Sequence, residues 1–218
     1  MENFQMPHYK EGKQTEQLEF SIIQEKVEAT KKKLTKEQLS YFWLLYYSGS
    51  RKSELYERTV GDCSISKDYF TLDLGIRKKG SAQTEPLDFP LWFPGMDVVC
   101  QWLEKARSLK SSRKLLERWN HQKRTTSRIK AKWLFPNIHR STANNIVKKI
   151  LGSEYYPHFL RLNRITELCS NPQANLTQIK SFSGIKSTRI IEENYMGISK
   201  RQQRDAVNFI GKQIKKEG

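Results

Sequence analysis

The sequence lacks the features that mark several common protein classes. Its 218 residues contain only three cysteines, and the separations between them fit neither a zinc site nor a set of disulfides. No stretch approaches the roughly 18 apolar residues that a membrane-spanning helix needs. Residues 1–14 are polar and contain no apolar run typical of a signal peptide. These absences favour a reducing, intracellular compartment and no membrane partner.

Acidic residues are also scarce. Asp and Glu number 23 against 39 Lys and Arg, which gives a net charge of +16 at pH 7. The carboxylates are scattered or lie next to basic residues, with no cluster of the kind that holds Mg²⁺ in nucleases, so we expect no metal or other cofactor. The positive charge is spread along the chain, which favours a polyanionic partner, most simply nucleic acid. A merely soluble basic protein is the alternative.

Hydrophobic periodicity predicts a mainly α-helical domain with a small antiparallel sheet of three strands, an α+β fold. Residues 1–16 form a flexible lead-in, residues 17–198 the domain, and residues 199–218 a basic helix that closes the domain or docks on a neighbouring subunit. The expected helices cover residues 17–33, 36–48, 96–109, 141–151, 157–169 and about 176–183, with one more after Ser187. The expected strands cover residues 62–66, 69–76 and 83–91.

Two stretches carry candidate residues for binding an anion. On a helix after Pro157, His158 and Arg161 lie three residues apart and share one face, where both can hold a single anionic group. Arg51 directly follows a buried helix and Gly49, a position that favours an anionic partner, either Glu54 or a nucleic-acid phosphate. The alternative is that these residues bind no external anion. His158 and Arg161 are then ordinary surface residues of a basic helix, and Arg51 forms a simple ion pair with Glu54.

Basic residues gather in two further places. The turn between the second and third strands carries Arg77, Lys78 and Lys79, which serve either as a solvated strand edge or as a lysine presented toward a phosphate. Residues 110–132 form the most basic segment, predicted as part helix (115–121) and part loop. It is interpreted as a surface that follows the DNA backbone, with a solvated linker as the alternative. The basic residues proposed to bind DNA there are Lys123, Arg124, Arg128 and Lys130.

Taken in order, these motifs resemble a known family. The box Gly49-Ser50-Arg51-Lys52-Ser53-Glu54-Leu55, a basic β-hairpin, the box His158-Phe159-Leu160-Arg161 and a late tyrosine resemble the catalytic domain of tyrosine recombinases, the phage integrase and Xer/Cre-type family. The resemblance covers about residues 17–200. It implies that the catalytic residues are Arg51, Lys79 (with Lys78 the close competitor), His158, Arg161 and the nucleophile Tyr195.

The chain departs from the family pattern in two ways. Lys186 stands nine residues before Tyr195, where the family commonly has histidine or tryptophan, and it can still donate to a phosphate oxygen. Full-length members also carry a helical DNA-clamping domain before the catalytic one, whereas only 16 residues precede the expected domain here. The chain is therefore either a catalytic-domain fragment or a naturally short member.

Cleavage of a phosphodiester requires a nucleophile, stabilisation of charge on the non-bridging oxygens, and an acid for the leaving oxygen. Two arginines and a histidine can stabilise the charge without a metal. A tyrosine has an ordinary pKa of about 10, so Tyr195 must lose its proton as it attacks, with His158 as base or proton relay. Lys79 is expected to protonate the departing 5′ oxygen, leaving a 3′-phosphotyrosine.

The expected function is a site-specific DNA strand-transfer enzyme, an integrase or recombinase. Its expected partner is double-stranded DNA, bound by a homotetramer on paired sites, in the cytoplasm and associated with the nucleoid. Two other functions remain open. One is a non-catalytic DNA-binding protein that keeps the fold, and the other is a relaxing enzyme similar to the type IB topoisomerases.

Overall fold

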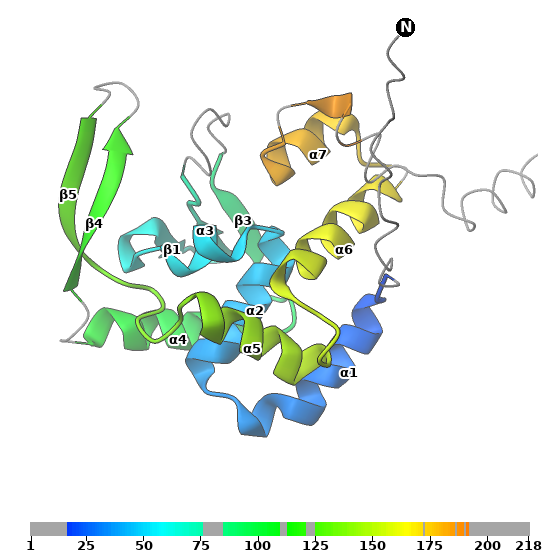
Figure 1. Cartoon of the computed structure of the whole chain (residues 1–218), viewed down its shortest axis with the longest axis horizontal. Coiled ribbons are helices and arrows are strands. Elements are labelled where there is room, and N and C mark those ends of the chain that lie inside the picture. The colour runs from blue at the N-terminus through cyan, green and yellow to red at the C-terminus, as the bar shows by residue number, and fades with distance from the viewer. Residues whose placement is uncertain are drawn as a thin grey trace, which may run out of the picture.

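The computed structural model describes residues 17–75, 85–109, 113–120, 125–171, 173–185, 187–189 and 191, with only the backbone given for residues 113–131. Within these ranges the chain is mainly helical, with a three-stranded and a two-stranded antiparallel sheet. The helices pack around helix α2, and the two-stranded sheet projects from the body (Figure 1).

Helix α2 (Lys36–Ser48) is the centre of the core, as its apolar sequence predicted. Thr35 and Gln38 form the predicted capping box: the Gln38 N–H donates to Thr35 Oγ1 (3.2 Å) and the Thr35 N–H donates to Gln38 Oε1 (3.1 Å). Every residue from Ser40 to Ser48 is buried. The helix ends at Gly49, whose φ of 54° is left-handed, the conformation for which glycine is favoured at this position.

The surrounding helices lie close to their predicted positions. Helix α1 (Phe20–Thr30) continues into a short 3-10 turn η1 (Lys31–Lys33), and α4 (Met96–Ser108) packs along α2. Gly95 precedes α4 with a φ of 80°, and a Cβ there would lie 2.1 Å from the Trp43 ring, so a glycine is required. Helices α5 (Arg140–Leu151) and α6 (Pro157–Cys169) complete the main core. Helix α5 begins at Arg140, one residue before the expected start, with His139 at the N-cap position.

The predicted three-stranded sheet is present, with shorter strands. It consists of β1 (Cys63–Ile65), β2 (Tyr69–Leu72) and β3 (Leu87–Pro90), antiparallel in the order β1-β2-β3. Helix α3 (Lys52–Tyr56) and the 3-10 turn η2 (Val60–Asp62) connect α2 to this sheet. The alternation that predicted the strands is visible in the burial of Phe70 and Leu72.

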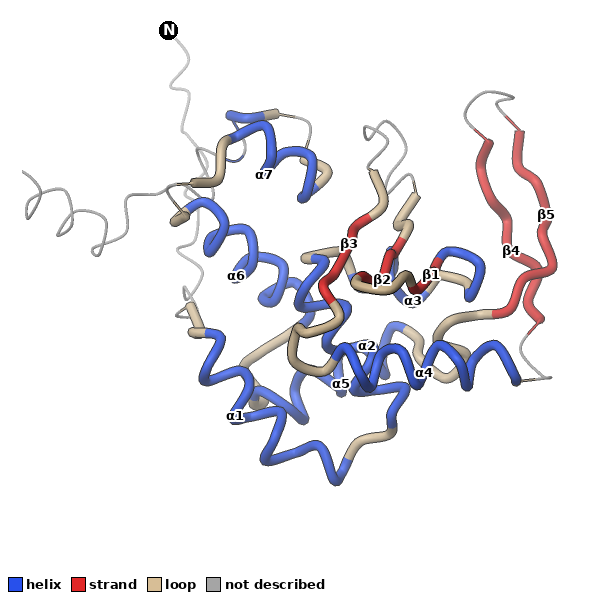
Figure 2. The backbone as a smooth tube through the Cα atoms, turned by 180° about the vertical axis from the view of Figure 1, so that it is seen from behind, coloured by secondary structure: helices blue, strands red, loops and turns tan. Residues whose placement is uncertain are grey.

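The prediction of a helix at residues 115–121 was wrong. Residues in this segment form strand β4 (Arg113–Asn120), which pairs with β5 (Thr125–Lys132) in a register that joins Arg113 to Lys132 and Asn120 to Thr125. Leucine, arginine and glutamate favour helices locally, but pairing with the Thr- and Ile-containing second strand overrides that preference. The sheet is tied to the body at its base, where Lys132 Nζ donates to the Arg107 carbonyl (2.5 Å) and Trp133 bridges to Thr59. Figures 1 and 2 show it extending to the same side as β2 and β3.

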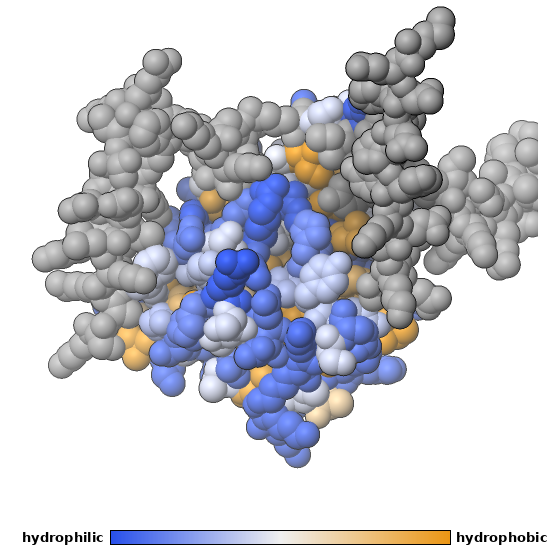
Figure 3. Space-filling model, in the orientation of Figure 1, coloured by the Kyte–Doolittle hydropathy of each residue, from blue (hydrophilic) through white to orange (hydrophobic). Residues whose placement is uncertain are grey.

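A smaller cluster follows α6. Helix α7 (Leu176–Ser183) begins at Asn175, which forms a capping box with Gln178, and ends at Gly184 with a φ of 65°. Ile191 packs there with Ile165 and Ile179, and the backbone is helical at Thr188, Arg189 and Ile191, as predicted. None of the helices in the described ranges is long and apolar enough to cross a bilayer. The face in Figure 3 is largely hydrophilic over the described residues.

Candidate active site

Arg161 is buried where three helices meet. It lies in the second turn of α6 and is only 2% exposed. Its Nη1 donates to the Gly49 carbonyl at 2.6 Å, and its Nη2 donates to the Ser183 carbonyl at 2.8 Å. These carbonyls lie at the C-terminal ends of α2 and α7, where the helix dipole places partial negative charge. The contacts hold the guanidinium group in a defined place, and carbonyl dipoles orient its positive charge without neutralising it.

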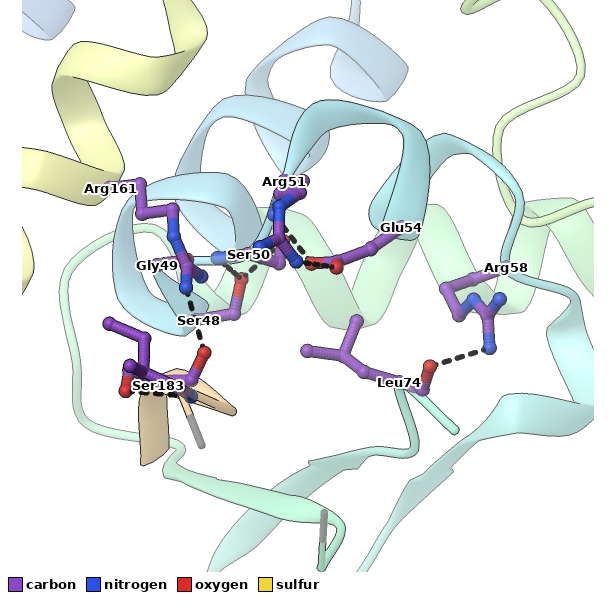
Figure 4. A network of polar contacts seen from close by, with 10 residues as sticks. Ser48, Gly49, Ser50, Arg51, Glu54, Arg58, Leu74, Arg161 and Ser183 are labelled. Atoms are coloured by element: carbon purple, nitrogen blue, oxygen red, sulfur yellow. Dashed lines mark hydrogen bonds and ion pairs between the residues drawn. The ribbon is translucent and has the colours of Figure 1, made fainter. Parts of the chain in front are cut away.

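The turn after α2 brings Arg51 to the same place. Ser50 N and Ser50 Oγ both lie within hydrogen-bond distance of Ser48 Oγ, at 3.2 and 2.9 Å, and both serines are buried. Gly49 lies in this turn, two residues before Arg51 in the chain. Its carbonyl accepts the hydrogen bond from Arg161. In Figure 4, Arg51 and Arg161 lie on either side of the turn, and their guanidinium groups point to the same side of it.

Glu54 is the anionic partner of Arg51 in this structure. Arg51 Nη1 lies 2.6 Å from Glu54 Oε1, and the Arg51 N–H donates to Glu54 Oε2 at 2.7 Å. The Glu54 side chain is 6% exposed, whereas that of Arg51 is 43% exposed. The ion pair that the sequence suggested is therefore present, and it leaves a large part of the arginine side chain accessible to a second anion.

His158 completes the described part of the site. It lies one helical turn before Arg161 on α6 and is exposed. Partial desolvation lowers the pKa of His158 below its ordinary value, and the positive charges of Arg161 and Arg51 lower it further. The contact of Arg161 with the Gly49 carbonyl, two residues before Arg51, brings α6 next to the turn that carries Arg51. A lowered pKa also keeps the imidazole neutral near pH 7, in the form that accepts a proton.

Several predicted site residues lie outside the described residues. These are Arg77, Lys78, Lys79, Lys123, Arg124, Lys186 and Tyr195. Arg128 and Lys130 lie in β5, where the structure gives the backbone. The described chain reaches Ile191, four residues before Tyr195.

Sequence reasoning missed two other cations near the site. Lys52 follows Arg51 at the start of α3, and Arg140 begins α5. Lys52 lies in the motif box around Arg51, but its contact with α5 could not be predicted because it joins segments far apart in the chain.

The fold was compared with known proteins. No family model matches the sequence, and no curated protein matches it. Among solved structures, XerA recombinase superposes with a TM-score of 0.61 at 14% identity, over 93% of this chain and 66% of that one. XerH site-specific recombinase bound to palindromic difH substrate, in a post-cleavage complex, gives a TM-score of 0.62 at 16% identity, over 87% and 52%. Its pre-cleavage complex with difH gives 0.58 at 16% identity, over 87% and 53%.

The chain thus spans between about half and just under two thirds of the length of these recombinases. At this level of identity the likeness establishes a shared fold. It confirms the mainly helical fold with a small antiparallel sheet that the sequence motifs predicted.

Proposed function

We propose that this chain, which has a tyrosine-recombinase-like fold, is a site-specific DNA strand-transfer enzyme that acts through a 3′-phosphotyrosine intermediate. The observation that supports the proposal best is the position of Arg161, whose guanidinium group binds the Gly49 carbonyl two residues before Arg51. Two motifs more than a hundred residues apart in sequence thereby supply positive charge to one place. Concentrated, oriented positive charge is what a phosphoryl transfer reaction requires.

In the proposed reaction the Tyr195 hydroxyl attacks the phosphorus of one DNA linkage. Arg51 and Arg161 stabilise the negative charge on the non-bridging oxygens, and His158 accepts the phenolic proton. The bond from phosphorus to the 5′ oxygen breaks, and Lys79 gives that oxygen a proton. Lys186 donates a hydrogen bond to a phosphate oxygen. Attack by the 5′ hydroxyl of another strand reverses these steps and exchanges partners.

Duplex DNA is the proposed partner. The net charge of +16 favours binding to its backbone, and XerH has been seen bound to a difH substrate. Strand β5 supplies Arg128 and Lys130 to this interface, and Arg77, Lys78, Lys123 and Arg124 are proposed to contribute as well. We further propose that the protein works as a tetramer on paired sites in the nucleoid.

One observation favours the alternative of a non-catalytic DNA-binding protein. Arg161 is nearly inaccessible and binds two carbonyls, and Arg51 pairs with a buried glutamate, so both arginines also stabilise the fold. A protein that had lost catalysis could retain them for that reason alone.

Covalent trapping separates the two functions. The protein is incubated in EDTA with a pool of nicked suicide duplexes of randomised sequence, and adducts are detected after denaturation. The proposal predicts a denaturation-resistant adduct with the unmodified protein and none with Tyr195→Phe. Duplex binding without any adduct would favour the non-catalytic protein, and an undiminished adduct in Tyr195→Phe would contradict the choice of nucleophile.

A further inference from the structure

A second group of positive side chains lies beside the candidate active site, between helices α3 and α5. Lys52 Nζ donates to Asn144 Oδ1 at 2.8 Å, which joins the first residue of α3 to the second turn of α5. Arg140 lies four residues before Asn144 and so occupies the same face of α5. The hydrogen bond therefore places the Lys52 ammonium group on the face of α5 that carries Arg140.

Tyr56 supports this arrangement from the other helix. It lies four residues after Lys52 in α3. Desolvation and then the charge of Glu57 raise the pKa of Tyr56, and the positive charge of Arg140 acts in the opposite direction. Arg140 also acts on Lys52: desolvation first, and then the charge of Arg140, lower the pKa of the ammonium group. Arg140 is thus electrostatically close to both side chains of α3.

Neither cation forms an ion pair with a carboxylate in the described part of the chain. The ion pairs there join Lys31 to Glu28, Arg51 to Glu54, Arg107 to Glu104, and Arg164 to Glu167. Like charges held near each other destabilise a fold unless an anion compensates them. Arg140 is exposed and Lys52 partly exposed, so an anion can reach both from solvent.

We propose that Lys52 and Arg140 together bind a non-scissile phosphate of the DNA backbone, next to the linkage that Arg51 and Arg161 hold. The proposal rests on the proposed function and adds a second contact point to it. Lys52 directly follows Arg51, so the two phosphate sites lie next to each other along one surface. Asn144 accepts from Lys52 through Oδ1, and its amide nitrogen remains a donor in the same site. Contacts to two neighbouring phosphates fix the position of one DNA strand, and this aligns the linkage that is cut.

The test measures duplex binding and its salt dependence for Lys52→Gln/Arg140→Gln, with a short random-sequence duplex as the probe. The matched control is Lys149→Gln/Lys148→Gln, which removes the same charge from the other end of α5. Loss of one phosphate contact should lower the magnitude of the slope of log K against log salt by about 1, with weaker binding to all sequences. The control is expected to leave the slope near that of the unmodified protein. Thermal unfolding followed by circular dichroism verifies that each variant is folded.

Two results bear on the proposals separately. If the unmodified protein binds duplex but Lys52→Gln/Arg140→Gln keeps its slope, or loses no more than the control, the second phosphate site is wrong and the proposed function stands. If the unmodified protein does not bind duplex at any salt concentration, the proposed function fails as well. The two single variants provide a further check, because side chains that share one phosphate should give a combined loss of slope no greater than about 1.

Discussion

Arg161 has a structural role that is independent of its proposed role in the chemistry. Its two carbonyl partners lie at the ends of α2 and α7, so the planar guanidinium group joins three helices. Lysine has the same charge but lacks the rigid fork that reaches two acceptors in fixed directions. The residue type is therefore constrained by the geometry, beyond the requirement for a positive charge.

We expect Arg161→Lys to lower the free energy of unfolding by roughly 2 kcal/mol, because at least one buried carbonyl loses its donor. It should also abolish cleavage. Arg164→Lys is the control, since Arg164 is on the same helix and its pair with Glu167 at 2.8 Å, like its position over the Tyr46 ring, requires a positive charge but no fork of donors. Chemical denaturation measures the unfolding free energy of both variants. Equal stability of the two variants would show that the carbonyl contacts contribute little.

The protonation of His158 tests the proximity of the two arginines without an activity assay. Partial desolvation and then the positive charges of Arg161 and Arg51 disfavour imidazolium, so the NMR titration midpoint of His158 is expected below the ordinary value of about 6.5. Arg51→Gln removes one of these charges and should move the midpoint upward. An unchanged midpoint in Arg51→Gln would mean that Arg51 lies too far away to act on His158.

The same shift makes stability depend on pH. The folded state binds the proton less tightly than the unfolded state, so the contribution of His158 to stability is present above about pH 6.5 and declines as the pH falls below it.

At residue scale, the sequence motifs predicted which charged residues belong to the candidate site. They could not predict the carbonyl partners of Arg161 or the contact between Lys52 and Asn144, because tertiary packing alone brings those segments together.

Among the secondary-structure elements, the turn between α2 and α3 determines the site geometry. Gly49 has a left-handed φ of 54°, and a Cβ there would lie 3.2 Å from the Phe182 ring on α7. Gly49→Ala is expected to lower the unfolding free energy by about 1–2 kcal/mol through backbone strain, and to displace the carbonyl that Arg161 binds. Gly61→Ala is the control, because the nearest atom to its Cβ would be 3.7 Å away. Equal melting temperatures for the two variants would contradict this account.

The β4–β5 sheet provides a second test among the elements. Arg113 and Lys132 pair directly across its base, so a short Gly-Ser linker can replace residues 114–131 with little distortion of the body. We expect this variant to melt close to the unmodified protein, because each strand pairs mainly with the other. Its affinity for duplex should fall and depend less on salt, since the linker removes Arg128 and Lys130. An unchanged affinity would exclude the sheet from the DNA interface.

Secondary-structure elements formed by interactions between residues close in sequence were easier to predict than elements formed by pairing with a separate segment. The ends of α2 and α7 were predicted closely, because capping boxes and left-handed glycines act within a few residues. The β4–β5 sheet was missed because pairing between two strands is decided by the partner strand, and residues 115–121 alone have the composition of a helix.

For the whole molecule, the central claim is that one compact domain gathers scattered positive charge around a single phosphate. The buried aromatic side chains of α2 form much of the core, with Arg161 and His158 on α6 and Arg51 at the N-cap of α3. The similarity to XerA and XerH shows a shared fold. The chemistry depends on whether Tyr195 enters the same space.

Identification of the residue that carries DNA tests this claim most directly. Adducts formed on nicked suicide duplexes in EDTA are digested with nuclease and protease, and the modified peptide is sequenced by mass spectrometry. The account predicts a nucleotide attached through a 3′ phosphate to Tyr195, and its disappearance in Arg51→Ala and Arg161→Ala, which still bind duplex. A phosphate attached to any other residue, or an adduct that survives loss of both arginines, would contradict it.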